Sequence, residues 1–262
     1  MRTLTALTVL NIIAVLNAEP AMKIRVIEGR PVAGNVYING RGPYTFLLDI
    51  AAQTNHIDER LAGKLGLQRT ARLEVVTISG TRMISAGQVD EIRLGEAAAK
   101  HQEMIFGDMS AVRQLVPEAD GVLGQEFLGK FDYLLDFRAR RIVFGPISTA
   151  SPRIQVRKLH GCMAVFSNLG DLLLDSGTDT LIVFSNKEES AAFQLVTSTG
   201  AIAANTGRRS RLMIDGVAYS AAKSVTMVPR GGQGNGLLPM AVFQSVYISN
   251  SGNYIIPNPT VD

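Results

Sequence analysis

Two aspartates each end an apolar run, and this setting suggests acid–base chemistry. Asp49 follows the apolar residues 46–48, and Asp175 follows the leucines 172–174. A carboxylate in this place must face water, a partner or a reaction, because an isolated buried charge is costly. If two such carboxyls shared one proton, the ionised one could take a proton from water while the neutral one hydrogen-bonds a carbonyl. That chemistry is hydrolysis by an activated water molecule, without a covalent intermediate.

The surroundings of the two aspartates repeat, which predicts two related lobes. Asp49-Ile50-Ala51-Ala52 in the first half corresponds to Asp175-Ser176-Gly177-Thr178 in the second. Farther on, Asp120-Gly121-Val122-Leu123-Gly124 matches Asn235-Gly236-Leu237-Leu238-Pro239, and the gap from aspartate to glycine is 72 residues in the first half and 61 in the second. A long period that occurs only twice indicates a pseudo-twofold duplication rather than a solenoid. Two such lobes would place both aspartates across one axis.

The pattern along the chain predicts a mostly β fold with few short helices. Residues 23–27 alternate polar and apolar side chains, as a half-buried strand does. Gly-containing or polar turns separate apolar runs in three further places, which predicts hairpins over 35–48, 73–89 and 133–144. Helical periodicity is found only over 58–65 and 110–115. We therefore predict two β-barrel-like lobes, residues 22–145 and 146–262.

Composition narrows the classes of function. Of the 262 residues, 46% are hydrophobic and 19% charged, so the chain can form a core and general disorder is excluded. The net charge of +3 gives no reason to expect nucleic-acid binding. A single cysteine allows no intramolecular disulfide, and one cysteine with three histidines argues against a Cys/His zinc site. Neither a metal nor an organic cofactor is implied.

The first residues predict a secretory signal peptide over 1–18. Arg2 precedes a mostly apolar stretch over 4–16, and Ala18 supplies a small residue for cleavage. As a helix, the apolar stretch would reach roughly 20 Å, too short to cross a bilayer. We expect an exported protein, periplasmic or secreted, with no stable membrane anchor. The alternatives are a first helix of the fold or an uncleaved membrane-proximal anchor.

The second motif carries a family resemblance. Asp175-Ser176-Gly177-Thr178 after an apolar strand resembles the active-site motif of pepsin-like and retropepsin-like aspartic proteases. Asp120-Gly121-Val122-Leu123-Gly124 resembles the apolar-apolar-Gly element that passes under this motif, and Gly236-Leu237-Leu238-Pro239 resembles its second-lobe partner. The chain is similar, over nearly all of 24–257, to bacterial exported aspartyl-protease-family proteins with two short lobes. The resemblance implies the bilobal acid-protease fold and an aspartic endopeptidase that acts on peptides or proteins in extended form.

The same resemblance implies a role for each residue of the motif. Asp49 and Asp175 would form the catalytic dyad. The Gly177 N–H and the Thr178 hydroxyl would both donate to the Asp175 carboxylate. Ser176 would tie the two active-site loops together through its hydroxyl.

The resemblance also implies a flap and shows where the first motif departs from the family. The flap, which would close over substrate and exclude water, falls at Ile78, Ser79, Gly80 and Thr81. In the first motif Ala52 fits the family pattern, but Ile50 replaces Thr or Ser and Ala51 replaces Gly. Ile50 cannot donate the loop-to-loop hydrogen bond, so we expect the partner groups of Ser176 to be left unpaired.

These departures keep two other functions open. One is a catalytically impaired pseudoprotease that binds extended peptides or serves as a structural module. The other is an exported ligand-binding β protein unrelated to peptidases, against which the paired Gly-apolar-apolar elements argue.

Four further residues could do chemistry but are given structural readings. His56 lies near Asp49, yet no Gly-x-Ser-x-Gly elbow accompanies it, so we expect a loop or surface histidine. His101 and His160 have no metal-ligand spacing. Cys162 follows a glycine on an expected strand, which is typical of a small buried side chain rather than a nucleophile.

Overall fold

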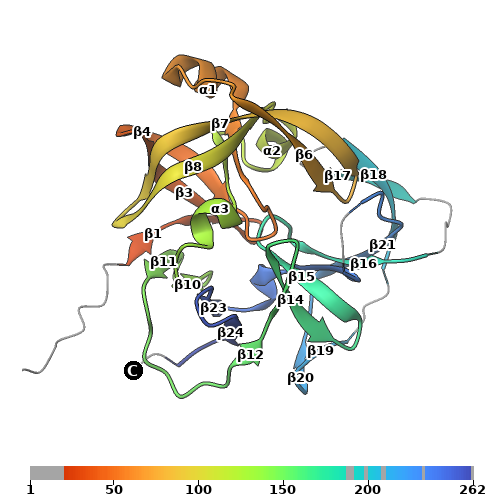
Figure 1. Ribbon diagram of the computed structural model, residues 1–262. Helices are drawn as coiled ribbons and strands as arrows, with labels where there is room; N and C mark the ends of the chain where they lie inside the picture. Colours follow the sequence, from red (N-terminus) through yellow and green to blue (C-terminus); the bar gives the residue numbers. More distant parts are fainter. Residues whose placement is uncertain (1–20, 187–191, 198–199, 208–210, 232–233, 261–262) are drawn as a thin grey trace, which may run out of the picture.

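The computed structural model describes residues 21–186, 192–197, 200–207, 211–231 and 234–260. They form three sheets, which Figure 1 shows with the N-terminal elements uppermost, coloured orange to yellow. The predicted signal peptide, residues 1–18, lies outside the described residues. None of the described helices is both long enough and apolar enough to cross a membrane.

An eight-stranded sheet makes up the N-terminal lobe, in the order β2-β3-β4-β9-β5-β8-β7-β6. Its strands are β2 (Arg25–Ile27), β3 (Arg30–Ile38), β4 (Arg41–Leu48), β5 (Asn55–Asp58), β6 (Ala71–Thr77), β7 (Gly80–Leu94), β8 (Ala97–Gly107) and β9 (Gly121–Leu123). Three short helices accompany it: α1 (Glu59–Leu65), α2 (Ser110–Leu115) and α3 (Gln125–Leu128). The predicted helix over 58–65 begins at Glu59, because the Asp58 side chain caps it by accepting from the N–H groups of Arg60 and Leu61.

A ten-stranded sheet makes up the C-terminal lobe, in the order β17-β18-β21-β16-β22-β15-β14-β19-β20, with β13 paired to β14. Its strands are β13 (Arg157–Leu159), β14 (Cys162–Ser167), β15 (Gly170–Asp175), β16 (Thr180–Phe184), β17 (Phe193–Thr197), β18 (Gly200–Thr206), β19 (Leu212–Ile214), β20 (Val217–Tyr219), β21 (Lys223–Met227) and β22 (Gly236–Pro239). A short 3-10 helix, η1 (Met240–Val242), follows β22.

A six-stranded sheet joins the two lobes. Its strands, in order, are β1 (Met22–Lys23), β11 (Arg141–Phe144), β10 (Tyr133–Asp136), β23 (Ser245–Ser249), β24 (Tyr254–Pro257) and β12 (Ile154–Gln155). The central pair, β10 with β23, comes from opposite halves of the chain, with Tyr133 opposite Ile248. The expected strand over 23–27 is divided between β1 and β2, so it serves both this sheet and the N-terminal one.

The strand residues that precede the two aspartate loops belong to one hydrophobic core. One cluster of buried side chains includes Leu48 and Leu123 from the N-terminal lobe and Leu174 and Leu238 from the C-terminal lobe, together with Ile248 from the joining sheet. The three predicted hairpins and both predicted helices are present, at bounds close to those expected. The prediction of a mostly β, bilobal fold is confirmed.

Candidate active site

Asp49 and Asp175 lie at equivalent ends of two strands. Asp49 directly follows β4, whose residue Leu48 pairs in parallel with Leu123 of β9. Asp175 is the last residue of β15 and pairs in parallel with Pro239 of β22. The apolar-Gly elements predicted from the repeat are therefore the strands that lie beside the two aspartate-bearing strands.

The two carboxyl groups converge on Gly177. A Cβ atom built on Gly177 would lie 2.7 Å from Asp49 Oδ2 and 3.3 Å from Asp175 Oδ1, so these two oxygens are no more than about 6 Å apart. Gly177 has no positive φ angle. The glycine is thus required by the close approach of the Asp49 carboxyl rather than by an unusual backbone conformation.

Backbone N–H groups hold each carboxylate in place. Asp175 Oδ1 accepts from the N–H groups of Gly177 (2.7 Å) and Thr178 (3.1 Å), and Asp49 Oδ1 accepts from that of Ala51 (2.9 Å). The predicted role of the Thr178 hydroxyl is wrong. This hydroxyl donates to the Thr180 carbonyl and accepts from the Thr180 N–H, because the loop turns its backbone, not its side chain, toward the carboxylate.

The electrostatics of the site favour a pair that carries one proton. Burial raises the pKa of the Asp175 carboxyl well above its ordinary value, and the negative charge of Asp49 raises it further. Burial also raises the pKa of Asp49, opposed by the N–H groups of Ala51, Ala52 and Gly177. Two buried carboxyls this close cannot both ionise easily, so one of them retains its proton.

The Ser176 hydroxyl, from the C-terminal lobe, connects the two aspartate loops. Its hydroxyl donates to the Leu48 carbonyl (2.7 Å) and accepts from the Ile50 N–H (3.0 Å), and the residue is fully buried. The expectation that the partner groups of Ser176 are unpaired is therefore wrong, since the Ile50 backbone supplies what its side chain cannot. The Ile50 side chain is itself only 1% exposed and belongs to the hydrophobic core.

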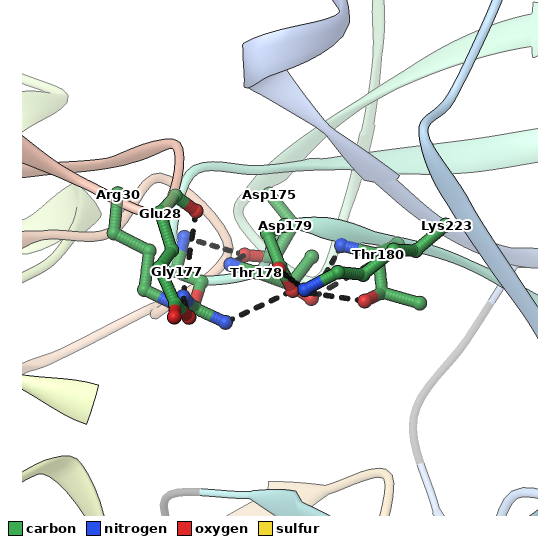
Figure 2. A network of polar contacts seen from close by, with 8 residues as sticks. All are labelled: Glu28, Arg30, Asp175, Gly177, Thr178, Asp179, Thr180 and Lys223. Carbon is green, nitrogen blue, oxygen red and sulfur yellow. Dashed lines mark hydrogen bonds and ion pairs between the residues drawn. The ribbon is translucent and has the colours of Figure 1, made fainter. Parts of the chain in front are cut away.

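Arg30 of β3 crosses to the Asp175 loop. Figure 2 shows its guanidinium between Glu28 and Asp179, with Gly177 beside it. Nε donates to the Gly177 carbonyl (2.9 Å), while the other two nitrogens donate to Asp179 Oδ1 (3.0 Å) and Glu28 Oε2 (3.1 Å). Asp179 also pairs with Lys223. The sequence did not single out Arg30, because 145 residues separate it from Asp175 and no local motif links them.

The predicted flap is the tip of the β6–β7 hairpin, where Thr77 pairs with Gly80. The Ile78 carbonyl accepts from the Arg230 N–H of the C-terminal lobe at 2.9 Å. A Cβ on Gly231 would lie 2.7 Å from the Thr77 carbonyl oxygen. The hairpin tip therefore reaches from one lobe to the other, as a flap that closes over substrate would.

The C-terminal lobe has an equivalent hairpin that the sequence analysis missed. β17 and β18 pair with Thr197 opposite Gly200, the same residue types that flank the turn of the first hairpin. The shared Thr-x-x-Gly pattern was the signal that could have found it.

His56 is not the loop or surface residue that was expected. It lies within β5, and a Cβ on Gly107 would come within 2.5 Å of its Nε2 atom, so the ring packs over that glycine. Nε2 is buried and has no hydrogen-bond partner among the described residues. Burial lowers the pKa of His56 to about 4, opposed by the negative charges of Asp58 and Asp108. The buried position of the His56 ring depends on Gly107 of the neighbouring strand β8, and the sequence around His56 does not show this pairing.

His56 is expected to make the fold sensitive to acid. Its folded pKa lies below the ordinary value of 6.5, so its contribution to stability is lost as pH falls from about 6.5 to about 4, by up to roughly 3 kcal/mol. Urea unfolding of His56→Leu at pH 7 and pH 4.5 should show a smaller loss than the wild type. The exposed His101, changed to Asn because its φ is positive, is the control and should leave the wild-type pH dependence. Equal losses in wild type and His56→Leu would contradict the assignment.

A metal ion has no evident place in the part of the chain that the structure describes, because no three His, Cys, Asp or Glu side chains gather there. His101 and His160 are both exposed. Cys162, the first residue of β14, is buried as expected, and its thiol donates to the Ala51 carbonyl at 3.1 Å.

The chain thus has a mostly β fold of two joined lobes, in which one aspartate loop from each lobe meets the other at Gly177. Residues 34–127 match the family model described as aspartyl protease. This match includes Asp49 and β9 and covers about a third of the chain. It confirms the resemblance to pepsin- and retropepsin-like aspartic peptidases.

The solved structures to which the chain is similar include the crystal structure of a retropepsin-like aspartic protease from Rickettsia conorii. The identity is 18%, the TM-score is 0.35, and the similarity covers 47% of this chain and 86% of that chain. No curated protein matches the chain.

Proposed function

We propose that the protein is an aspartic-type endopeptidase that hydrolyses peptide bonds with a water molecule activated between Asp49 and Asp175. The observation that carries the proposal is the convergence of the two carboxyl groups on Gly177, each from a different lobe and each held by backbone N–H groups. A pair of buried carboxyls that retains one proton has both the base and the acid that such hydrolysis needs.

The reaction would proceed in two steps, each with two proton transfers. The ionised carboxyl takes a proton from water as the water oxygen attacks the carbonyl carbon, and the neutral carboxyl gives its proton to the carbonyl oxygen. When the tetrahedral intermediate collapses, the leaving nitrogen takes a proton from one carboxyl, the other carboxyl takes a proton from a hydroxyl of the intermediate, and the C–N bond breaks. The dyad then again holds one proton. The Cys162 thiol is unsuited to a covalent route, because burial and the two aspartate charges raise its pKa to about 12.

The substrate would bind as an extended strand beneath the flap. The β6 strand is an edge of its sheet, so its outer backbone groups can pair with a peptide. The flap tip already contacts the loop at Arg230, so substrate entry requires this contact to open. Closure would then exclude water other than the attacking molecule.

Peptide binding without catalysis is the second candidate, and the first motif is what favours it. Only the second motif supplies a hydroxyl between the loops, that of Ser176, since Ile50 has none to offer. Ala51 also places a methyl group where the second lobe has Gly177, the residue that must be bare for the opposite carboxyl to approach. A displacement of a catalytic group by about 1 Å can lower the rate about a hundredfold.

The test is cleavage of a peptide mixture by the purified full chain from acidic to neutral pH in water enriched in 18O. We expect cleavage with one 18O atom in each new carboxyl group. Cleavage should continue in the presence of a metal chelator, a serine-directed reagent and a thiol alkylator. These three reagents inhibit contaminating proteases of other classes. No cleavage at any pH by a demonstrably folded protein would overturn the proposal. A large gain of activity in the Ile50→Thr/Ala51→Gly variant would show that the natural site is impaired and would favour peptide binding.

A further inference from the structure

Two tight turns, one in each lobe, place Arg30 and Cys162 in equivalent positions. The β2–β3 turn at Glu28 and Gly29 has φ angles of 47° and 79°, and the β13–β14 turn at His160 and Gly161 has the same two values. Arg30 and Cys162 are the first residues of the strands that follow, β3 and β14. The two side chains therefore correspond under the pseudo-twofold relation, although their chemistry differs.

Both side chains donate to the aspartate loop of the opposite lobe. Arg30 Nε donates to the Gly177 carbonyl at 2.9 Å, and Cys162 Sγ donates to the Ala51 carbonyl at 3.1 Å. Gly177 and Ala51 each lie two residues after a catalytic aspartate. The contacts are thus reciprocal, and each lobe fixes the loop that carries the other lobe's carboxyl.

The position of these carbonyls determines where the next N–H points. A peptide unit is planar, and its C=O and N–H point in opposite directions. The unit between Gly177 and Thr178 directs its N–H to the Asp175 carboxylate. The unit between Ala51 and Ala52 directs its N–H to the main-chain carbonyl of Asp49 (3.2 Å), which closes the turn in which the Ala51 N–H reaches Asp49 Oδ1 (2.9 Å). A donor that holds the carbonyl end therefore also orients the N–H end, which bonds the carboxyl in the Asp175 loop and closes the turn around the carboxyl in the Asp49 loop.

We propose that Cys162 is a positioning residue for Asp49: its thiol holds the Ala51–Ala52 peptide unit, as Arg30 holds the Gly177–Thr178 unit for Asp175. The inference rests on the proposed function for its catalytic meaning, but its structural part does not. The two contacts differ in strength, because Arg30 is an ion-paired guanidinium that donates to three residues and Cys162 is a neutral thiol that donates to one. The Ala51 carbonyl is therefore less firmly held than the Gly177 carbonyl.

The surroundings keep Cys162 in its donor form. The side chain is 6% exposed, and burial first, then the charges of Asp49 and Asp175, raise its pKa to about 12. The thiol therefore keeps its proton over the whole range in which the dyad would work, so the bond to Ala51 is available throughout.

The test compares Cys162→Ala, which removes the donor, with Cys162→Ser, which keeps one. The first readout is the titration of the aspartate side-chain carboxyls by 13C NMR, which needs no turnover. In Cys162→Ala we expect the pKa of Asp49 to rise, because the turn that holds the Ala51 N–H against Asp49 Oδ1 is less firmly fixed. In Cys162→Ser we expect it to stay near the wild-type value.

The second readout is the kinetics of peptide cleavage. Cys162→Ala should lower kcat about three- to tenfold with KM little changed, and should move the acid limb of the pH–rate profile to higher pH. Ser167→Ala, on the same strand, is the control, because its hydroxyl bonds only within its own turn. An Asp49 titration in Cys162→Ala equal to that of the wild type would overturn the inference. The expected titration shift in a protein that cleaves no peptide would support positioning and contradict the proposed function.

Discussion

Asp175→Asn and Asp49→Asn should each lower the rate of peptide cleavage by roughly a hundred- to ten-thousandfold, the range expected for loss of a general acid or base. An asparagine can accept the N–H bonds that hold each carboxylate, so the loops should keep their positions. It cannot, however, exchange a proton with water or with the peptide nitrogen. Both variants should therefore be folded and inactive.

The pH dependence of stability separates lost chemistry from lost structure. Because burial and the Asp49 charge raise the folded pKa of Asp175, its contribution to stability is present at low pH and is lost as pH rises through that pKa. Asparagine does not ionise, so Asp175→Asn should be at least as stable as the wild type at neutral pH. Thermal unfolding at pH 4 and pH 7 measures this difference.

The control for both variants is Asp215→Asn. Asp215 is exposed in the β19–β20 turn with a φ of 48°, a conformation that asparagine also adopts readily. It should leave activity and stability unchanged. Full activity of Asp175→Asn would exclude the dyad mechanism.

Ser176→Ala should lower the free energy of unfolding by about 2–5 kcal/mol and also lower activity. The change leaves the Leu48 carbonyl and the Ile50 N–H buried without their partner, and each unpaired group costs about 1–3 kcal/mol. Because this hydroxyl spans the two lobes, its loss should also let the Asp49 and Asp175 loops shift relative to each other. Urea unfolding and cleavage kinetics measure the two effects.

Ser167→Ala is the matched control for this change. Ser167 is also buried and also donates one bond and accepts one, but both lie within the β14–β15 turn. It should cost less stability and leave cleavage unchanged. Ser176→Thr keeps the hydroxyl and should retain activity. Equal effects of the Ser176→Ala and Ser167→Ala changes would show that the inter-lobe bond has no special role.

The sequence predicts those parts of the molecule whose residue pattern occurs in both halves of the chain. The apolar strands that end at Asp49 and Asp175, and the apolar-Gly strands beside them, are recognisable because both copies keep the same residue types. The hairpins and the helix capped by Asp58 are local and follow from turn and capping chemistry.

The remainder depends on contacts between lobes, where the two copies have diverged. Arg30 and Cys162 share a backbone position but no chemistry, so no residue pattern connects them. The Ser176 hydroxyl bonds the backbone of Leu48 and Ile50, and residues of almost any type at these two positions would offer the same backbone groups. For this reason the sequence predicts that Ile50 leaves the partner groups of Ser176 unpaired, whereas in the structure the Ser176 hydroxyl still bonds the backbone of the Asp49 loop.

The sheet that joins the lobes has a consequence for how the chain can be made. Tyr133 in β10 pairs with Ile248 in β23, so this edge of β10 has no partner until the 115 residues that follow Tyr133 have been synthesised. Until then the first half carries an open strand edge, which is able to pair with another nascent chain. Contacts this distant in sequence also close slowly. β23 and β24 therefore complete the sheet that joins the two lobes, and until these strands have been synthesised the chain is open to aggregation at the edge of β10.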